Sequence, residues 1–206
     1  DFYYNSTTGQ FKTVNTGGVA LGTWSSGGDL NAARTDFTGT GTKAAGLAIG
    51  GRPGNQVLVE QYDGSSWSEI AEIGTGRYAA AAAGSPSAAL YFGGYISTAP
   101  SGAKTLTESW NGSSWTEVND LNSTIAYHFG MGTSTAAISA AGNRYPTVVA
   151  NYETWNGSSW TAAGSMNTAK RVGARGIGVL TAAIASGGQL PPNARTDQVE
   201  LFDGSS

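Results

Sequence analysis

The residues with the clearest chemical potential are four glutamates that recur at one position of a repeated phrase. They are Glu60, Glu108, Glu153 and Glu200. Carboxylates can act as general acids or bases, and pairs of them hydrolyse glycosidic bonds. A group that is present in every repeat more often supports the fold. We therefore expect these glutamates to accept hydrogen bonds from neighbouring backbone, Arg34 or Arg77.

Nucleophilic and metal-assisted chemistry is poorly supported by the composition. The chain has one histidine, His128, and no cysteine. Catalytic triads need a placed histidine, and zinc sites use several histidine or cysteine ligands. No Gly-x-Ser-x-Gly nucleophile motif is present. Because His128 falls in a column of the repeat, we expect it to be structural, and we predict a non-enzymatic chain without metal or other cofactor.

A second set of polar and aromatic residues lies in four segments whose lengths differ between repeats. Each runs from a Gly-Gly or Ala-Gly step to the repeated glutamate, over 9, 14, 11 and 12 residues. Insertions in repeat proteins map to loops on one face, often the binding face. Such residues could bind sugars or acidic glycans by hydrogen bonds and stacking, or could simply be solvated loop tips. The candidate ligand-binding residues are Arg52, Asn55, Tyr95, Lys104, Arg144, Tyr145, Asn193 and Arg195.

The elements that must position both sets are short strands joined by tight turns. Glu-Ser-Trp-Asn-Gly-Ser-Ser-Trp at 108–115 recurs with one change at 153–160, and as Glu-Gln-Tyr-Asp-Gly-Ser-Ser-Trp at 60–67. Asn-Gly and Asp-Gly favour a hairpin turn with positive φ at both central positions. The aromatic residues on the two arms would then pair across the strands. A fourth copy, from Glu200 to Ser206, has no second aromatic residue.

The tryptophans place this phrase within a longer repeat. Trp24, Trp67, Trp115 and Trp160 lie 43, 48 and 45 residues apart. Each copy contains four strand-like runs, which in the second copy are residues 78–83, 88–92, 106–110 and 115–118. The first run is built of small residues, which suits strands that crowd around a central axis. Four strands per repeat indicate an all-β fold, a β-propeller with about four four-stranded blades.

We divide the chain into an N-terminal hairpin and closing segment, 1–23, and four repeats. The repeats are 24–66, 67–114, 115–159 and 160–206. The strand that carries Trp24 could complete the final blade and close a four-bladed ring, since overlapping ends leave no free strand edge. Alternatively, the repeats belong to a larger propeller.

Charge and hydropathy limit the classes of partner that the chain could bind. Charged residues are 12% of the chain, glycines number 31 of 206, and the net charge is −3. This balance provides no basic face for nucleic acid. No apolar run of 18 residues is present either, so we expect no membrane insertion.

The order of the elements resembles the kelch repeat. Each copy begins with a strand of small residues, an apolar strand and a Gly-Gly step. A variable loop, a Glu-x-aromatic sequence, a turn, a tryptophan and an arginine then follow. The double glycines at 50–51, 93–94 and 187–188 match this pattern, and the third copy departs from it with Ala141-Gly142 and Ile125. The resemblance covers residues 24–206 and implies kelch-like four-stranded blades.

A narrower resemblance is to kelch-like virion proteins of tailed marine bacteriophages. It rests on the aromatic-Asn-Gly-Ser-Ser-Trp-Thr repeats and on Tyr-Tyr-Asn-Ser-Thr-Thr-Gly-Gln-Phe-Lys at 3–12. It implies a structural or adhesive module of the tail or particle surface, located on the virion or extracellularly. The implied partners are other virion proteins, a host-surface glycan or further copies of the chain. The alternatives are a secreted glycan-binding propeller and, third, a glycan-active enzyme.

Overall fold

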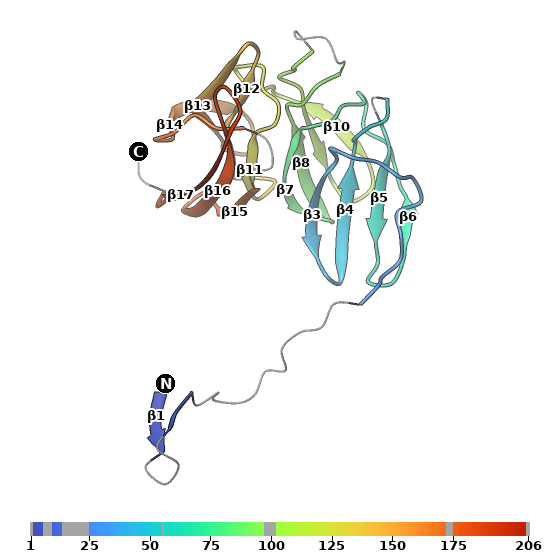
Figure 1. The fold of residues 1–206 in the computed structure, drawn as a ribbon. Helices are drawn as coiled ribbons and strands as arrows, with labels where there is room; N and C mark the ends of the chain where they lie inside the picture. The colour runs from blue at the N-terminus through green and yellow to red at the C-terminus, as the bar shows by residue number, and fades with distance from the viewer. Residues whose placement is uncertain are drawn as a thin grey trace.

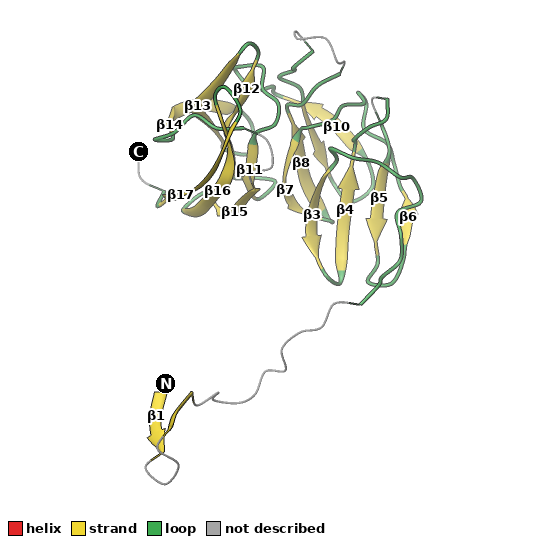
Figure 2. Cartoon of the chain, in the orientation of Figure 1, coloured by secondary structure: helices red, strands yellow, loops and turns green. Residues whose placement is uncertain are grey.

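The computed structural model describes residues 2–5, 10–13, 25–54, 56–96, 102–171 and 175–204, with backbone alone for 2–5, 10–13 and 175. All regular elements of these residues are β-strands, in four antiparallel sheets and one hairpin (Figures 1 and 2). The four sheets are the blades of a β-propeller, which confirms the predicted fold class. Within the described residues, no helix of membrane-crossing length and apolarity occurs.

The strands follow one another in simple up-and-down order within each blade. The N-terminal hairpin comprises β1 (Phe2–Asn5) and β2 (Gln10–Thr13). Blade 1 comprises β3 (Thr38–Thr42), β4 (Ala45–Ile49), β5 (Val59–Tyr62) and β6 (Trp67–Glu69). Blade 2 comprises β7 (Ala81–Ser85), β8 (Ala88–Phe92), β9 (Thr107–Trp110) and β10 (Trp115–Val118). Blade 3 comprises β11 (Phe129–Gly132), β12 (Ala137–Arg144), β13 (Thr147–Trp155) and β14 (Trp160–Ser165). Blade 4 comprises β15 (Arg175–Val179), β16 (Ala182–Leu190) and β17 (Ala194–Phe202).

The innermost strands lie side by side along the propeller axis, in the order β3, β7, β11, β15 (Figure 1). Small residues are needed there, as predicted. A Cβ atom on Gly130 of β11 would come within 2.7 Å of the Ala81 Cβ atom of β7, closer than two carbon atoms can pack. The described strands of blades 1 and 4 make no contact of comparable extent.

The predicted strands of the second repeat match blade 2, with shifted bounds in β7 and β9. β7 ends at Ser85 and not at residue 83, and β9 begins at Thr107 and not at residue 106. The innermost strand begins at Ala81 and not at residue 78, because Ala79 has a φ of 54° and breaks the extended backbone. The repeats that start at Trp67, Trp115 and Trp160 each begin in the outermost described strand of one blade and continue into the next blade. Blade 4 has no fourth strand among the described residues. The Trp24 strand that we expected there lies outside them.

The repeated phrase is a hairpin, but the expected turn geometry is wrong. Trp110 pairs with Trp115 across the strands, with ring centroids 5.3 Å apart. In the turn, Gly112 has a φ of 95°, whereas Asn111 keeps a negative φ. The Asn111 side-chain oxygen accepts hydrogen bonds from the backbone N–H groups of Ser113 and Ser114, at 2.9 Å each. Asparagine is therefore selected for this side-chain-to-backbone turn and not for a positive φ.

The hydrophobic core is a series of interfaces between consecutive blades. We call the side of a blade that is turned toward the next blade its forward face, and the opposite side its rear face. Leu47 of the blade 1 forward face packs with Ala89, Tyr91 and Trp110 of the blade 2 rear face. Leu90 and Ile138 take the same role in blades 2 and 3. Alternation along each strand separates the two faces.

Candidate functional site

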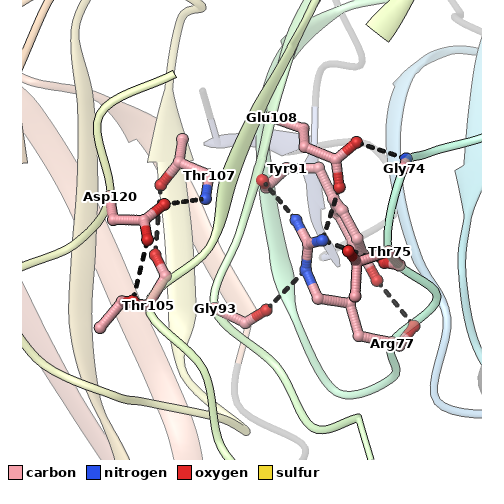
Figure 3. Close-up of polar contacts among 9 residues, drawn as sticks. All are labelled: Gly74, Thr75, Arg77, Tyr91, Gly93, Thr105, Thr107, Glu108 and Asp120. Atoms are coloured by element: carbon pink, nitrogen blue, oxygen red, sulfur yellow. Dashed lines mark hydrogen bonds and ion pairs between the residues drawn. The ribbon is translucent and has the colours of Figure 1, made fainter. Parts of the chain in front are cut away.

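The repeated glutamates lie on the rear faces, where they hold blades together. Figure 3 shows Glu108, whose Oε1 atom is 2.6 Å from Arg77 Nη1 and whose Oε2 atom accepts a 2.7 Å hydrogen bond from the Gly74 N–H. The Arg77 side chain is fully buried. Its guanidinium also donates to the carbonyl oxygens of Thr75, Tyr91 and Gly93. All three guanidinium nitrogens thus donate to protein oxygens, which suits a structural role.

The other three blades repeat this arrangement with one substitution. Arg34 pairs with Glu60 at 3.0 Å, and Lys170 pairs with Glu200 at 3.2 Å. In blade 3 the cation is replaced by Ile125, and Glu153 instead accepts two 2.8 Å hydrogen bonds from Asn122. We call these four arrangements the glutamate layer. Its carboxylates are buried and engaged, so they are poorly placed to act on a ligand.

His128 is buried between blades 2 and 3. Its Nε2 atom is 3.2 Å from the carbonyl oxygen of Phe92, and its Nδ1 atom is 2.8 Å from Ser139 Oγ. A carbonyl oxygen only accepts, so Nε2 carries the proton and Nδ1 accepts from the serine hydroxyl. Burial disfavours the charged ring and lowers the pKa of His128 from 6.5 to about 4. The ring is a neutral link between two blades.

A ring of backbone bridges lies next to the glutamate layer, at the end of the blades that carries the variable loops. In each blade the residue after the Arg34 column pairs with the residue after the Gly-Gly column. The pairs are Thr35 with Arg52, Tyr78 with Tyr95, Ala126 with Asn143 and Arg171 with Gln189. The backbone geometry is the same in all four, whereas the side chains differ from pair to pair. We call this end of the molecule the mouth.

Backbone hydrogen bonds also connect consecutive blades at the mouth. The Ala79 N–H donates to the Asp36 carbonyl oxygen, and the Tyr127 N–H donates to the Ala79 carbonyl oxygen, at 2.8 Å each. These three residues have φ values of 51° to 54°. A left-handed conformation at a residue other than glycine costs on the order of 1 kcal/mol. In blades 1 to 3, the residues with this strained backbone are the same ones that make the interblade hydrogen bonds.

Aromatic and charged side chains gather on this backbone ring. Tyr95 lies 5.7 Å from Tyr78 and 5.8 Å from Tyr127, measured between ring centroids. The Arg52 guanidinium carbon is 5.2 Å from the Tyr78 ring centroid, and Arg52 pairs with Asp36 at 2.6 Å. We call these five residues the mouth cluster. Burial, reinforced by neighbouring Asp36, raises the pKa of the Tyr127 hydroxyl, so it stays protonated and able to donate at neutral pH.

A groove of about 490 Å³ lies between the loops of blades 3 and 4. Tyr145 is 56% exposed and stands at its wall, and Arg171 contributes a guanidinium that donates to the Asn193 side-chain oxygen at 2.9 Å. The pKa of the Tyr95 hydroxyl is raised mainly by burial and also by Tyr78 and Tyr145, while Arg171 opposes the rise. Asn143, which lines the groove, pairs with Ala126, the chain neighbour of Tyr127, so the groove adjoins the mouth cluster. Its lining is Asn143, Tyr145, Pro146, Thr147, Val148, Arg171, Pro191 and Pro192.

The structure brings together some of the predicted binding residues. Arg52 and Tyr95 belong to the mouth cluster, Tyr145 lines the groove, and Asn193 holds Arg171. The other predicted residues are not part of either set: Lys104 is half-buried and bridges Ile125, Arg144 pairs with Thr147, and Arg195 is exposed opposite Gln189. Asn55 lies outside the described residues.

Sequence reasoning missed Asp36, Tyr78, Tyr127 and Arg171. All four lie one or two residues after the Arg34 column, in a stretch that we assigned to the first strand or to its approach. The sequence carries no clear signal for them, because the columns on both sides vary between the repeats as well.

An apolar cavity of about 110 Å³ lies between blades 3 and 4. Met131, Ile138, Tyr152, Met166 and Phe202 are among the residues that line it. Between blades 2 and 3, Trp160 of the outermost strand packs against Phe92 with ring centroids 4.8 Å apart. No described strand of blade 4 carries the corresponding tryptophan, which accounts for the cavity. In the described part of the chain, histidines and carboxylates nowhere gather in threes as a metal site would require.

Comparison with known proteins identifies the fold and no family. No protein-family model matches the sequence, and no curated protein matches it. Among solved structures, the chain is similar to YjhT with a TM-score of 0.71 and 11% sequence identity, over 96% of this chain and 71% of that chain. At this identity the similarity supports the β-propeller fold alone.

Proposed function

We propose that this propeller is a non-catalytic adhesion module that binds a glycan at its mouth. The observation that carries the proposal is the convergence of four tyrosines and two arginines from different blades. Tyr78, Tyr95, Tyr127 and Tyr145 gather there with Arg52 and Arg171. Tyr78 and Tyr95 are buried in a core cluster between blades, at 6% and 7% exposed. The side chains that a ligand could reach are therefore Tyr127, Tyr145, Arg52 and Arg171.

The chemistry of these side chains favours a sugar with a negative charge. Tyrosine rings offer flat apolar faces for the C–H side of a pyranose and a hydroxyl for hydrogen bonding. Arginine recognises carboxylates and sulfates with two parallel N–H donors. Arg171 donates from Nη2 to Asn193, and its buried Nε atom has no hydrogen-bond partner among the described residues. Arg171 thus keeps donor capacity at the wall of the groove.

The biological setting is proposed from the sequence resemblance. We propose that the blades are kelch-like and that the chain belongs to the tail or surface of a phage particle, where it contributes to attachment to the host. Two features support this proposal. The Asn-Gly-Ser-Ser turns are repeated from blade to blade, whereas the side chains of the mouth differ, as expected of a constant scaffold with a variable binding surface. A secreted lectin-like propeller would use the same mouth. Finding the chain in purified particles favours attachment, and finding it only as a free extracellular protein favours the lectin.

A glycan array with the intact chain, followed by calorimetric titration of the best acidic glycan, tests the binding proposal. We expect Arg171→Gln and Tyr145→Ala each to weaken binding at least tenfold. Arg195→Gln is the matched control, because Arg195 is exposed on the neighbouring β17 but outside the groove, and it should bind as the wild type does. A chain that binds no glycan, or three variants that lose affinity equally, would contradict the proposal.

A further inference from the structure

The forward face of blade 4 has the composition of an interface but is exposed. Leu47, Leu90 and Ile138 occupy one position of the second strand in blades 1 to 3, and their exposed fractions are 2%, 0% and 2%. Ile184 occupies this position in blade 4 and is 42% exposed. The residue is equally apolar in all four blades, so the difference is that no described blade covers it.

The exposed apolar residues of blade 4 form one continuous patch. Ile177 pairs with Ile184 on the adjacent strand, and Ile184 pairs with Leu201 on the next. Cross-strand partners point to the same side of a sheet. The patch, which we call the forward patch, consists of Ile177, Val179, Ile184, Val199 and Leu201, with exposed fractions of 66%, 46%, 42%, 57% and 77%. Contiguous exposed apolar surface of this kind marks an interaction site.

The three internal interfaces show what such a face packs against. In each case it meets a rear face that presents a small residue on the second strand and an aromatic residue on the third. Leu90 meets Ala137 and Trp155, and Ile138 lies with Ala183 and Phe202. The fitting partner of the forward patch is therefore a propeller rear face.

The chain has one rear face that no described blade covers, and it belongs to blade 1. Beside Gly46 of the second strand, this face presents Tyr62 on the third strand and Trp67 on the fourth. Its remaining part is already buried, because Arg34 and Asn31 bind there to Glu60. Tyr62 and Trp67 are half-buried, with ring centroids 5.1 Å apart. Their counterparts in blade 3, Trp155 and Trp160, are 2% and 5% exposed because blade 2 covers them.

We infer that two copies of this chain join head to tail, the forward patch of blade 4 in one copy packing on the blade 1 rear face of the other. Both halves of this interface lie on the same molecule, and their residue types are those of three interfaces that already exist within it. Within one molecule, the described strands of blade 1 do not cover the forward patch of blade 4. The two faces are different surfaces, so the contact is heterologous and can repeat from copy to copy until a ring closes.

Sedimentation velocity of the intact 21.0 kDa chain over a thousandfold concentration range tests this inference. We expect the wild type to self-associate. The double variant Ile177→Asp with Leu201→Asp should be monomeric, with association weakened at least a hundredfold. Both side chains are more than half exposed, so its melting temperature should stay unchanged. Tyr145→Asp, which places the same charge on an exposed aromatic residue of the mouth, is the control and should associate normally.

Mixing of variants separates a head-to-tail contact from a symmetric one. Tyr62→Arg blocks the rear face, so this variant alone should also be monomeric. Mixed with the forward-patch double variant, it should form a 1:1 complex, because each partner then supplies the one intact face that the other lacks. A monomeric wild type, self-association that survives the forward-patch changes, or a mixture that stays monomeric would overturn the inference. Self-association of Tyr62→Arg on its own would indicate a symmetric forward-to-forward contact and would also overturn it.

Discussion

The glutamate layer and the mouth are both built from positions that occur once in every blade, yet they differ in what is kept constant. In the glutamate layer the side chains recur, with a glutamate in all four blades and a cation in three. At the mouth the backbone bridges recur while the paired side chains are different in each blade. The comparison teaches that this repeat fixes side chains in the glutamate layer and fixes only the backbone at the mouth.

Blade 3 shows that the glutamate of the layer has hydrogen-bond donors even where the cation is missing. Ile125 removes the cation, but Glu153 still accepts hydrogen bonds from the backbone and side chain of Asn122. A buried carboxylate without partners would cost several kcal/mol. Variation is therefore allowed in the layer only where another donor replaces the one that is lost. At the mouth, Thr35 and Arg52 are exposed, so water can satisfy the polar groups of their side chains.

The largest effect is expected from breaking the layer in blade 2. Arg77→Met leaves the Glu108 carboxylate buried with only the Gly74 N–H as a partner. The free energy of unfolding should fall by about 3–5 kcal/mol, as for other buried ion pairs that lose one partner. Urea denaturation measures this change. A decrease in the unfolding free energy of less than about 1 kcal/mol would show that the glutamate layer does not stabilise the fold.

A second effect should appear as the pH is lowered. Since the folded-state pKa of His128 is about 4 and the unfolded value is 6.5, the unfolded chain binds the proton more tightly. The stability contribution is present above pH 6.5 and is lost as the pH falls toward 4, by roughly 3 kcal/mol in total.

The matched variant for this titration is His128→Gln. Its amide can donate to the Phe92 carbonyl oxygen and accept from Ser139 but does not titrate. Thermal unfolding from pH 7 to 4 should therefore show a smaller slope for the variant than for the wild type, while the carboxylates affect both chains alike. Parallel slopes would mean that His128 is not a buried neutral link.

The smallest effect is expected at the mouth. Arg52→Met removes the ion pair with Asp36, in which the side chains are 45% and 27% exposed. Partly exposed pairs contribute at most about 1 kcal/mol, so the unfolding free energy should change by less than that. The same urea experiment that is used for Arg77→Met provides the measurement. If the two substitutions lower the unfolding free energy equally, the distinction between the glutamate layer and the mouth is wrong.

The sequence predicted the blades well because their determinants are local. Alternating apolar residues, paired tryptophans and glycine turns specify strands within a few residues of one another, and β8 (Ala88–Phe92) and β10 (Trp115–Val118) match prediction in both bounds. The binding residues were harder to predict. Arg52 meets Tyr78 of the next blade, and Tyr95 meets Tyr127 of the blade after it. Such contacts depend on how blades rotate about the axis, which no local pattern encodes.

The backbone hydrogen bonds that run from Asp36 to Ala79 and on to Tyr127 have a consequence for protein engineering. The spacing of the blades around the opening is held by main-chain atoms, so it does not depend on which side chains stand there. The bridged positions that are exposed or half-buried, Thr35, Arg52, Arg171 and Gln189, could therefore be randomised together in a display library with the scaffold intact. The fold would then serve as a platform for selecting new recognition surfaces.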